Sequence, residues 1–92
     1  MRFTVTGTVQ GVGFRPTVYR LATDLGLKGT VRNNGANVII DVDADEDFMD
    51  LLKGRLPALA HIESFTMEEI PLPDGIEGFS IVESGHEGKG MG

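Results

Sequence analysis

The spacing of apolar residues predicts a strand and then a helix at the start of the chain. Between residues 2 and 8, apolar or small residues alternate with threonines, and this period of two is typical of a strand. From Arg15 onward the spacing becomes that of a helix, and Gly26 is the expected C-terminal stop. The buried stripe of this helix is predicted to consist of Val18, Leu21, Ala22 and Leu25.

The rest of the chain predicts a second helix and four further strands. Strands at residues 27–32 and 37–42 are joined by Asn33-Asn34-Gly35, whose residues tolerate the positive φ of a hairpin turn. An acidic segment at residues 43–47 suits a helix start, and Pro57 marks the end of that helix. Its buried stripe is predicted to be Phe48, Leu51, Leu52 and Leu56. A fourth strand at residues 62–70, a loop at 71–75 and a short last strand at 79–82 complete the pattern.

Taken in order, these elements predict an α+β fold, the ferredoxin-like βαββαβ sandwich. Each βαβ half is a right-handed crossover, and two such halves interleave into one antiparallel sheet with both helices on one face. The 92 residues suffice for one domain with a single core, which we expect to span residues 1–83. Residues 84–92 hold four glycines and one large apolar side chain, so a flexible Gly-rich tail or linker is expected there.

Composition and charge exclude several classes of function. The chain has no cysteine, which excludes disulfides, thiolate catalysis and thiolate zinc sites. Its net charge of −6 argues against nucleic acid as the main partner. The apolar runs are too short to span a bilayer and no signal peptide precedes the first strand, so a cytoplasmic protein is expected.

The charges are also unevenly distributed along the chain. Residues 1–40 carry five basic side chains against one acidic, whereas residues 41–92 carry three basic against thirteen acidic. This distribution favours a small anion near the N-terminal half and repels long polyanions elsewhere. An ordinary solvated surface with uneven charge is the alternative.

The segment Gly7-Thr8-Val9-Gln10-Gly11-Val12-Gly13-Phe14-Arg15-Pro16 combines three features that attract anions. Glycines allow positive φ and inward-facing N–H groups, which form an anion-binding nest. Arg15 adds a permanent charge whose planar fork fits two phosphate oxygens. With Pro16 at its first position, the following helix directs its free N–H groups and positive dipole end at the same place.

The spacing of these glycines differs from the common nucleotide-binding motifs. The dinucleotide fingerprint requires G-x-G-x-x-G, and the ATP/GTP loop requires Gly-Lys-Ser/Thr, whereas here Gly13 is followed by Phe14-Arg15. A phosphate site and a plain strand-to-helix turn with a surface arginine both remain open on composition. For the phosphate site, the binding residues are predicted to be Gln10, Gly11, Val12, Gly13, Phe14 and Arg15.

Two motifs resemble those of the acylphosphatase family. G-x-V-Q-G-V-G-F-R at residues 7–15 resembles the phosphate-binding loop of that family, and Gly29-Thr30-Val31-Arg32-Asn33 resembles its second motif, which ends in an asparagine. The resemblance covers about residues 2–83, and Thr30 departs from it because the family usually carries an aromatic residue there. It implies hydrolysis of acyl phosphates, catalytic roles for Arg15 and Asn33, and neither a metal nor another cofactor.

The chemistry of an acyl phosphate suits these residues. Because the substrate is already activated, it needs phosphate positioning, charge neutralisation and an oriented water rather than a strong nucleophile. Asn33 has a carbonyl acceptor and an NH₂ donor with which to hold that water. Hairpin-turn chemistry is the alternative for Asn33 and our interpretation of Asn34. Arg32 is expected to point away from Asn33, and His61 and His86 predict no metal pair.

A narrower resemblance links the chain to the N-terminal domain of the HypF hydrogenase-maturation carbamoyltransferases. It rests on Arg15-Pro16 with Val18-Tyr19-Arg20-Leu21-Ala22, and on Leu56-Pro57 with Leu59-Ala60-His61-Ile62. This resemblance implies carbamoyl phosphate as the substrate. In a full-length HypF it also implies the downstream carbamoyl-transfer domains as partners, with neither nucleic acid nor membrane. A free-standing acylphosphatase and a non-catalytic small-anion-binding module remain the alternatives.

Overall fold

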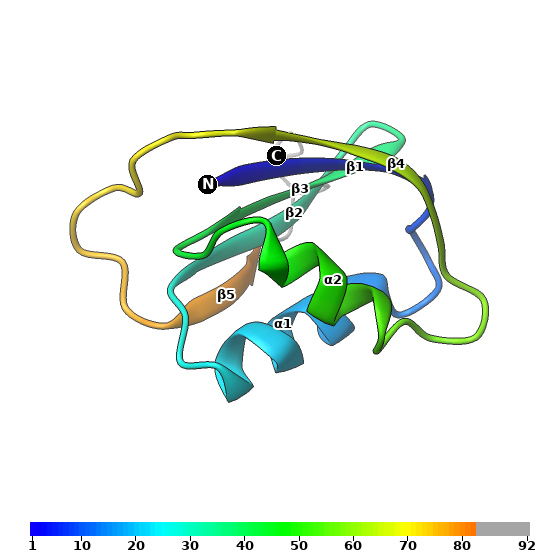
Figure 1. Ribbon diagram of the computed structural model, residues 1–92, viewed down its shortest axis with the longest axis horizontal. Coiled ribbons are helices and arrows are strands. Elements are labelled where there is room, and N and C mark those ends of the chain that lie inside the picture. The colour runs from blue at the N-terminus through cyan, green and yellow to red at the C-terminus, as the bar shows by residue number, and fades with distance from the viewer. Residues whose placement is uncertain (83–92) are drawn as a thin grey trace, which may run out of the picture.

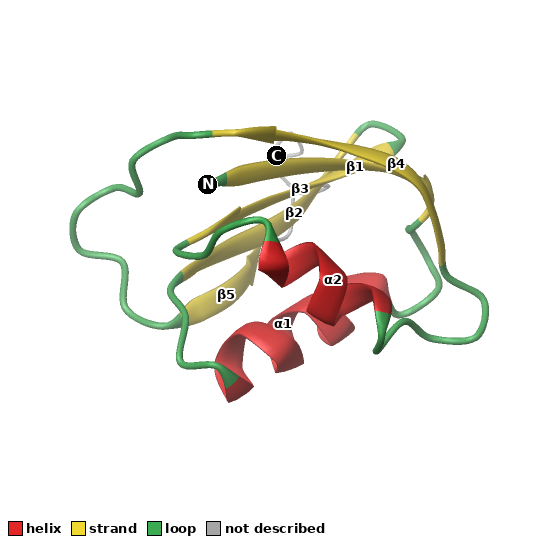
Figure 2. Cartoon of the chain, in the orientation of Figure 1, coloured by secondary structure: helices red, strands yellow, loops and turns green. Residues whose placement is uncertain are grey.

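The computed structural model describes residues 1–82, so the predicted tail at residues 84–92 lies outside the described part. The described elements are β1 (Arg2–Thr8), α1 (Phe14–Asp24), β2 (Gly29–Asn34), β3 (Asn37–Val42), α2 (Asp47–Lys53), β4 (His61–Glu68) and β5 (Phe79–Val82). The strands form one sheet in the order β4-β1-β3-β2-β5. Both helices cover the same face of this sheet (Figure 1; Figure 2).

The strand order confirms the ferredoxin-like class. Strands β4, β1, β3 and β2 pair antiparallel, with β1 and β3 side by side in the centre. The short β5 adds to β2 in parallel, so that Gly29 lies opposite Phe79. The ends of β1 and β2 and the start of β3 therefore share one end of the sheet, because Val5 and Asn33 both lie opposite Val38.

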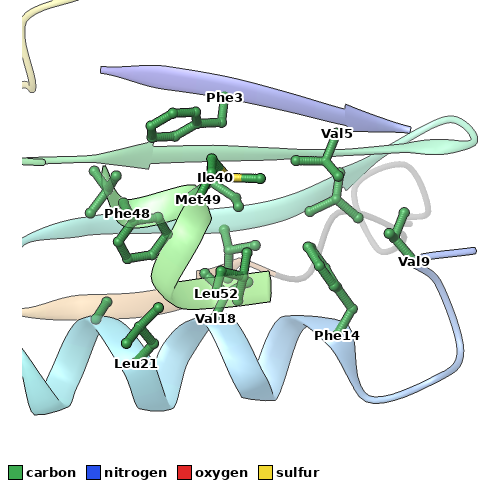
Figure 3. Packing of buried hydrophobic residues seen from close by; sticks show 14 of the residues in the cluster. Phe3, Val5, Val9, Phe14, Val18, Leu21, Ile40, Phe48, Met49 and Leu52 are labelled. Carbon is green, nitrogen blue, oxygen red and sulfur yellow. The ribbon is translucent and has the colours of Figure 1, made fainter. Parts of the chain in front are cut away.

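The core lies between the sheet and the two helices. Phe3, Val5, Val31 and Val38 are fully buried, and each lies at an alternate position of its strand. Alternation places all four on the helix-covered face, where Figure 3 shows Phe3 and Val5 above the helices. The ring of Phe3 stacks on that of Phe48, with centroids 6.0 Å apart. Truncation of such a phenylalanine to alanine costs about 3–5 kcal/mol of unfolding free energy.

Two predicted members of the helical stripes are exposed to solvent. Leu25 is 46% exposed because α1 ends at Asp24 and Leu25 is its C-cap. Leu51 is 49% exposed, whereas Met49 is fully buried, because α2 turns Phe48, Met49 and Leu52 toward the core. Helix α2 also ends at Lys53, before the predicted stop at Pro57, since Gly54 forms its C-cap.

The second strand begins and ends two residues later than predicted. Gly26 has φ 71°, and the N–H of Leu27 donates to the carbonyl of Ala22, which together form a Schellman motif. Leu27 is thus part of the helix cap, and the strand begins only at Gly29. At the other end Asn34 pairs with Asn37, so the turn consists of the two residues 35 and 36.

The predicted bounds of β1, β3 and β5 are confirmed, whereas β4 is displaced from the predicted residues 62–70 to His61–Glu68. At the start of β1, the Arg2 guanidinium makes a two-pronged ion pair with the Asp41 carboxylate, at 2.8 and 3.1 Å. Hydrogen bonding and charge attraction from Asp41 raise the pKa of Arg2. This pair joins β1 to β3 at the end of the sheet opposite the glycine-rich loop.

Candidate active site

The loop that links β1 to α1 is anchored in the core at both of its ends. Val9 and Phe14 are each only 1% exposed, and Figure 3 shows both side chains at the same end of the core. Between them, Gln10, Gly11 and Gly13 are exposed. The two ends of the loop are therefore buried, and its middle is exposed where a ligand can reach it.

The backbone of this loop presents N–H donors that the described residues do not use. Gly11 and Gly13 have φ 75° and 83°, which is the left-handed conformation that glycine adopts without a Cβ penalty. Within residues 1–82, the N–H groups of residues 10–15 donate no hydrogen bond to the protein. Gly13 is the N-cap of α1 and has no side-chain cap. A row of free N–H groups at a helix start is the arrangement that binds phosphate oxygens.

Helix α1 begins one residue before Arg15, where the helical spacing starts, and two residues before Pro16, which was predicted to be its first position. Phe14 is the first helical residue, so Pro16 occupies the third position and not the first. The reason is the burial of Phe14, which brings the helix start against the core directly after Gly13. Proline is compatible with this position because the first four N–H groups of a helix have no partner within the helix.

The sequence interpretation missed Thr17. Its hydroxyl donates to the carbonyl of Gly13 at 2.9 Å, and its backbone N–H donates to the same carbonyl at 3.3 Å. Both bonds hold the Gly13 carbonyl toward the helix and away from the row of free donors. The sequence signal was a hydroxyl residue four positions after the last glycine of the loop, one helical turn away.

Arg15 is the second residue of α1 and is half-buried. Among the described residues, the ion pairs are Arg2 with Asp41 and Arg55 with Asp24, so the guanidinium of Arg15 is not engaged with a carboxylate. Its charge stands at the positive end of the helix dipole, beside the free N–H groups. The loop and Arg15 thus form one electropositive patch.

Asn33 carries a buried amide oxygen without a partner. It lies two residues after Val31, so strand alternation places both on the helix-covered face of β2. Its Oδ1 is buried and accepts no hydrogen bond from the described residues. An unsatisfied buried polar atom costs about 1–3 kcal/mol, so native proteins rarely retain one without a water or a ligand. This atom is therefore a candidate holder of a water molecule.

Gln10 brings the loop and the hairpin together. Its side-chain NH₂ donates to the carbonyl of Gly35 at 2.6 Å and to that of Asn37 at 3.0 Å. Both side-chain donors are thus used within the protein, and the backbone N–H of Gln10 is the group left for the predicted anion contact. Because Asn33 lies in the same hairpin, this bridge puts the predicted water-holding residue beside the predicted phosphate loop.

Other predicted or excluded residues lie as their strands require. Arg32 and Thr30 alternate with buried Val31, so both lie on the face of the sheet opposite Asn33. Thr30, where the family usually carries an aromatic residue, is therefore on the other side of the sheet from the site. His61 starts β4 and is exposed, whereas His86 lies outside the described residues.

The described part of the chain contains neither of two features that would indicate other functions. No cluster of three metal-ligating side chains occurs between residues 1 and 82. None of the helices described here combines the length and the apolar content needed to cross a bilayer.

Comparison with known proteins yields one family. The acylphosphatase family model matches residues 1–81. The carbamoyltransferase HypF2 of Cupriavidus necator is 44% identical over 88 residues, which is 91% of this chain and 11% of that protein. An acylphosphatase of Caldivirga maquilingensis is 42% identical over 86 residues, covering 88% of this chain and 90% of that protein.

The solved structures agree with the sequence relatives. The crystal structure of T. kodakarensis HypF superimposes with a TM-score of 0.76 at 39% identity, covering 91% of this chain and 12% of that one. The chain thus spans about a tenth of the length of the carbamoyltransferases it matches, but nearly the whole of a free acylphosphatase. With a family model that covers residues 1–81, the chain belongs to the acylphosphatase family.

Proposed function

We propose that this domain hydrolyses acyl phosphates to a carboxylate and inorganic phosphate. The observation that carries the proposal is the pairing of two unsatisfied features at one end of the sheet. One is the row of N–H groups at residues 10–15 with the guanidinium of Arg15, and the other is the buried Oδ1 of Asn33; within residues 1–82 these groups have no partner. The first suits a phosphoryl group and the second suits the water that attacks it.

The proposed roles follow from the chemistry of the bond that breaks. Loop N–H groups and Arg15 hold the phosphoryl oxygens and neutralise their charge as the P–O bond to the carboxylate breaks. Asn33 accepts a hydrogen bond from the water, whose oxygen forms the new bond to phosphorus and whose protons remain on the oxygens of the phosphate product. The carboxylate leaves as a stable anion, so the step needs no strong acid. It needs no covalent intermediate either.

For the physiological substrate we propose carbamoyl phosphate. The support is the 44% identity to a HypF carbamoyltransferase, of which this chain corresponds to 11% of the length. In that setting carbamate is the product, and the domains that follow in the larger protein consume it. The 42% identity to an acylphosphatase over 90% of its length supports the second candidate, a general acylphosphatase without such partners.

Steady-state hydrolysis of benzoyl phosphate and carbamoyl phosphate tests the proposal. The wild-type protein should hydrolyse both, and Arg15→Ala should lose about 2–4 kcal/mol of transition-state stabilisation, which corresponds to a loss of roughly 30- to 1,000-fold in kcat/KM. Arg20→Ala is the matched control, because it removes an exposed arginine from the same helix. Phosphate binding without turnover would instead indicate an anion-binding module. A strong preference for benzoyl phosphate would favour the general acylphosphatase.

A further inference from the structure

Gln10 is exposed, yet its side chain makes two hydrogen bonds to the backbone of the β2–β3 hairpin. One NH₂ group donates to two carbonyls of the hairpin, that of Gly35 in the turn at 2.6 Å and that of Asn37 at the start of β3 at 3.0 Å. An amide nitrogen has two hydrogens, so both donors are used. The side chain is exposed, and the two bonds therefore do not serve to bury a polar group.

The two segments that Gln10 joins carry the two halves of the proposed site. Residues 10–13 of the loop make no backbone hydrogen bond as donors within the described chain, and two of them are glycines in the left-handed conformation. Such a segment does little to fix its own conformation, because glycine has the widest choice of backbone conformations. The hairpin on the other side of the bridge holds Asn33 in β2, directly opposite Val38.

We propose that Gln10 is a positioning residue that sets the placement of the phosphate loop relative to Asn33. This inference rests on the proposed function and assigns Gln10 a part in it that does not involve contact with the phosphate by its side chain. Buried Val9 and Phe14 anchor the two ends of the loop in the core, and the side chain of Gln10 anchors its middle to the hairpin. Without the bridge the loop still binds phosphate, but the water on Asn33 and the phosphorus are no longer held in line. Misplacement of a reacting pair is costly to rate even where binding is retained.

The test uses Gln10→Met, which keeps the length of the side chain and removes both donors. We expect kcat for benzoyl phosphate to fall by about tenfold while the inhibition constant of inorganic phosphate changes by less than about threefold. Gln10→Lys restores N–H donors and should recover most of kcat. Thr6→Val is the control, because it removes a side-chain hydrogen bond to the carbonyl of Ser64 between β1 and β4.

A double-mutant cycle identifies the partner through which Gln10 acts. In the Asn33→Ala background, the change Gln10→Met should lower kcat by less than about twofold, because the residue whose position it sets is gone. An equal tenfold loss in both backgrounds would overturn the proposal, as would a parallel loss of phosphate affinity. Unchanged kcat in Gln10→Met would overturn it as well.

A second readout separates this proposal from the proposed function. In ¹H–¹⁵N spectra, Gln10→Met should shift both the side-chain amide signal of Asn33 and the backbone amide signals of the loop, whereas Thr6→Val should shift neither. If the wild-type protein hydrolyses no acyl phosphate, the proposed function fails and these spectra alone decide whether Gln10 positions Asn33. Unchanged Asn33 and loop signals in Gln10→Met would contradict the positioning role.

Discussion

At the scale of single residues, the site is defined by groups that lack partners. The guanidinium of Arg15 makes no ion pair within the described chain, and the buried Oδ1 of Asn33 has no donor. Among the described residues, Asn33 Oδ1 is the one buried side-chain polar atom without a partner, whereas Arg2 pairs with Asp41 across the sheet. Unsatisfied groups are a cost to folding, so their presence together in one region points to a ligand that satisfies them.

Asn33→Ala should lower kcat by roughly 100-fold or more while leaving phosphate affinity within about threefold of wild type. The reason is that Asn33 holds the water and not the phosphoryl group. The melting temperature should stay within a few degrees of wild type, because the variant removes an unsatisfied buried acceptor. Calorimetric titration with inorganic phosphate, alongside steady-state kinetics, measures both quantities.

Asn34→Ala is the matched control for that experiment, since Asn34 is the exposed neighbour at the end of β2. Its kinetics should resemble those of the wild type. If Asn33→Ala instead lost phosphate affinity and turnover in equal proportion, Asn33 would be a binding residue, and the proposed water-holding role would be wrong.

At the scale of elements, helix α1 is the part that orients the donors. Thr17 holds the Gly13 carbonyl through its hydroxyl and its backbone N–H, which anchors the last loop residue to the first helical turn. Thr17→Val should cost about 1 kcal/mol of unfolding free energy, or about 4–8 °C in melting temperature, through the loss of one hydrogen bond. Phosphate affinity should fall several-fold, because the Gly13 carbonyl beside the anion is then held by the backbone N–H of Thr17 alone.

Thr17→Ser keeps the hydroxyl and serves as the reference for that effect. Thermal unfolding and phosphate titration of both variants measure the two consequences separately. Wild-type phosphate affinity in Thr17→Val, together with a lower melting temperature, would limit Thr17 to a structural role.

Also at this scale, the sequence predicted which elements exist better than it predicted where they end. The alternation and the helical spacing of apolar residues identify every described strand and helix. The errors fell where a cap or a turn competes with the pattern. Leu27 is apolar and looked like the start of a strand, but its N–H completes the Schellman cap of α1. Asn33 looked like a turn residue, but the turn needs only residues 35 and 36, so Asn33 stays in β2.

The site was predictable in part for a related physical reason. The glycines and Arg15 belong to one continuous segment, so their local conformation is encoded in neighbouring residues. The bridge from Gln10 to the hairpin spans 25 and 27 residues of sequence, and no local pattern signals it. The burial of Met49 in place of Leu51 likewise depends on the rotation of α2 against the sheet, which helical spacing alone does not set.

At the scale of the whole molecule, the sheet has two ends with different character. The glycine loop, Arg15 and the β2–β3 hairpin share one end. The other end holds a cavity of about 400 Å³ whose lining includes Met1, Lys28, Asp43 and the loop at residues 70–76. Its lining holds the N-terminal ammonium and Lys28 together with the carboxylates of Asp43 and Asp74, so it serves as the comparison site for a small anion. Phosphate should bind at the loop of residues 10–15 and not in this cavity.

The most direct measurement is a titration of the ¹⁵N-labelled protein with inorganic phosphate, followed by the backbone amide signals. We expect saturable shifts that are largest for residues 10–15, absent in Arg15→Ala and retained in Arg20→Ala. Shifts concentrated around Lys28 and residues 70–76, or unaffected by Arg15→Ala, would contradict the assignment of the phosphate site to the loop between β1 and α1.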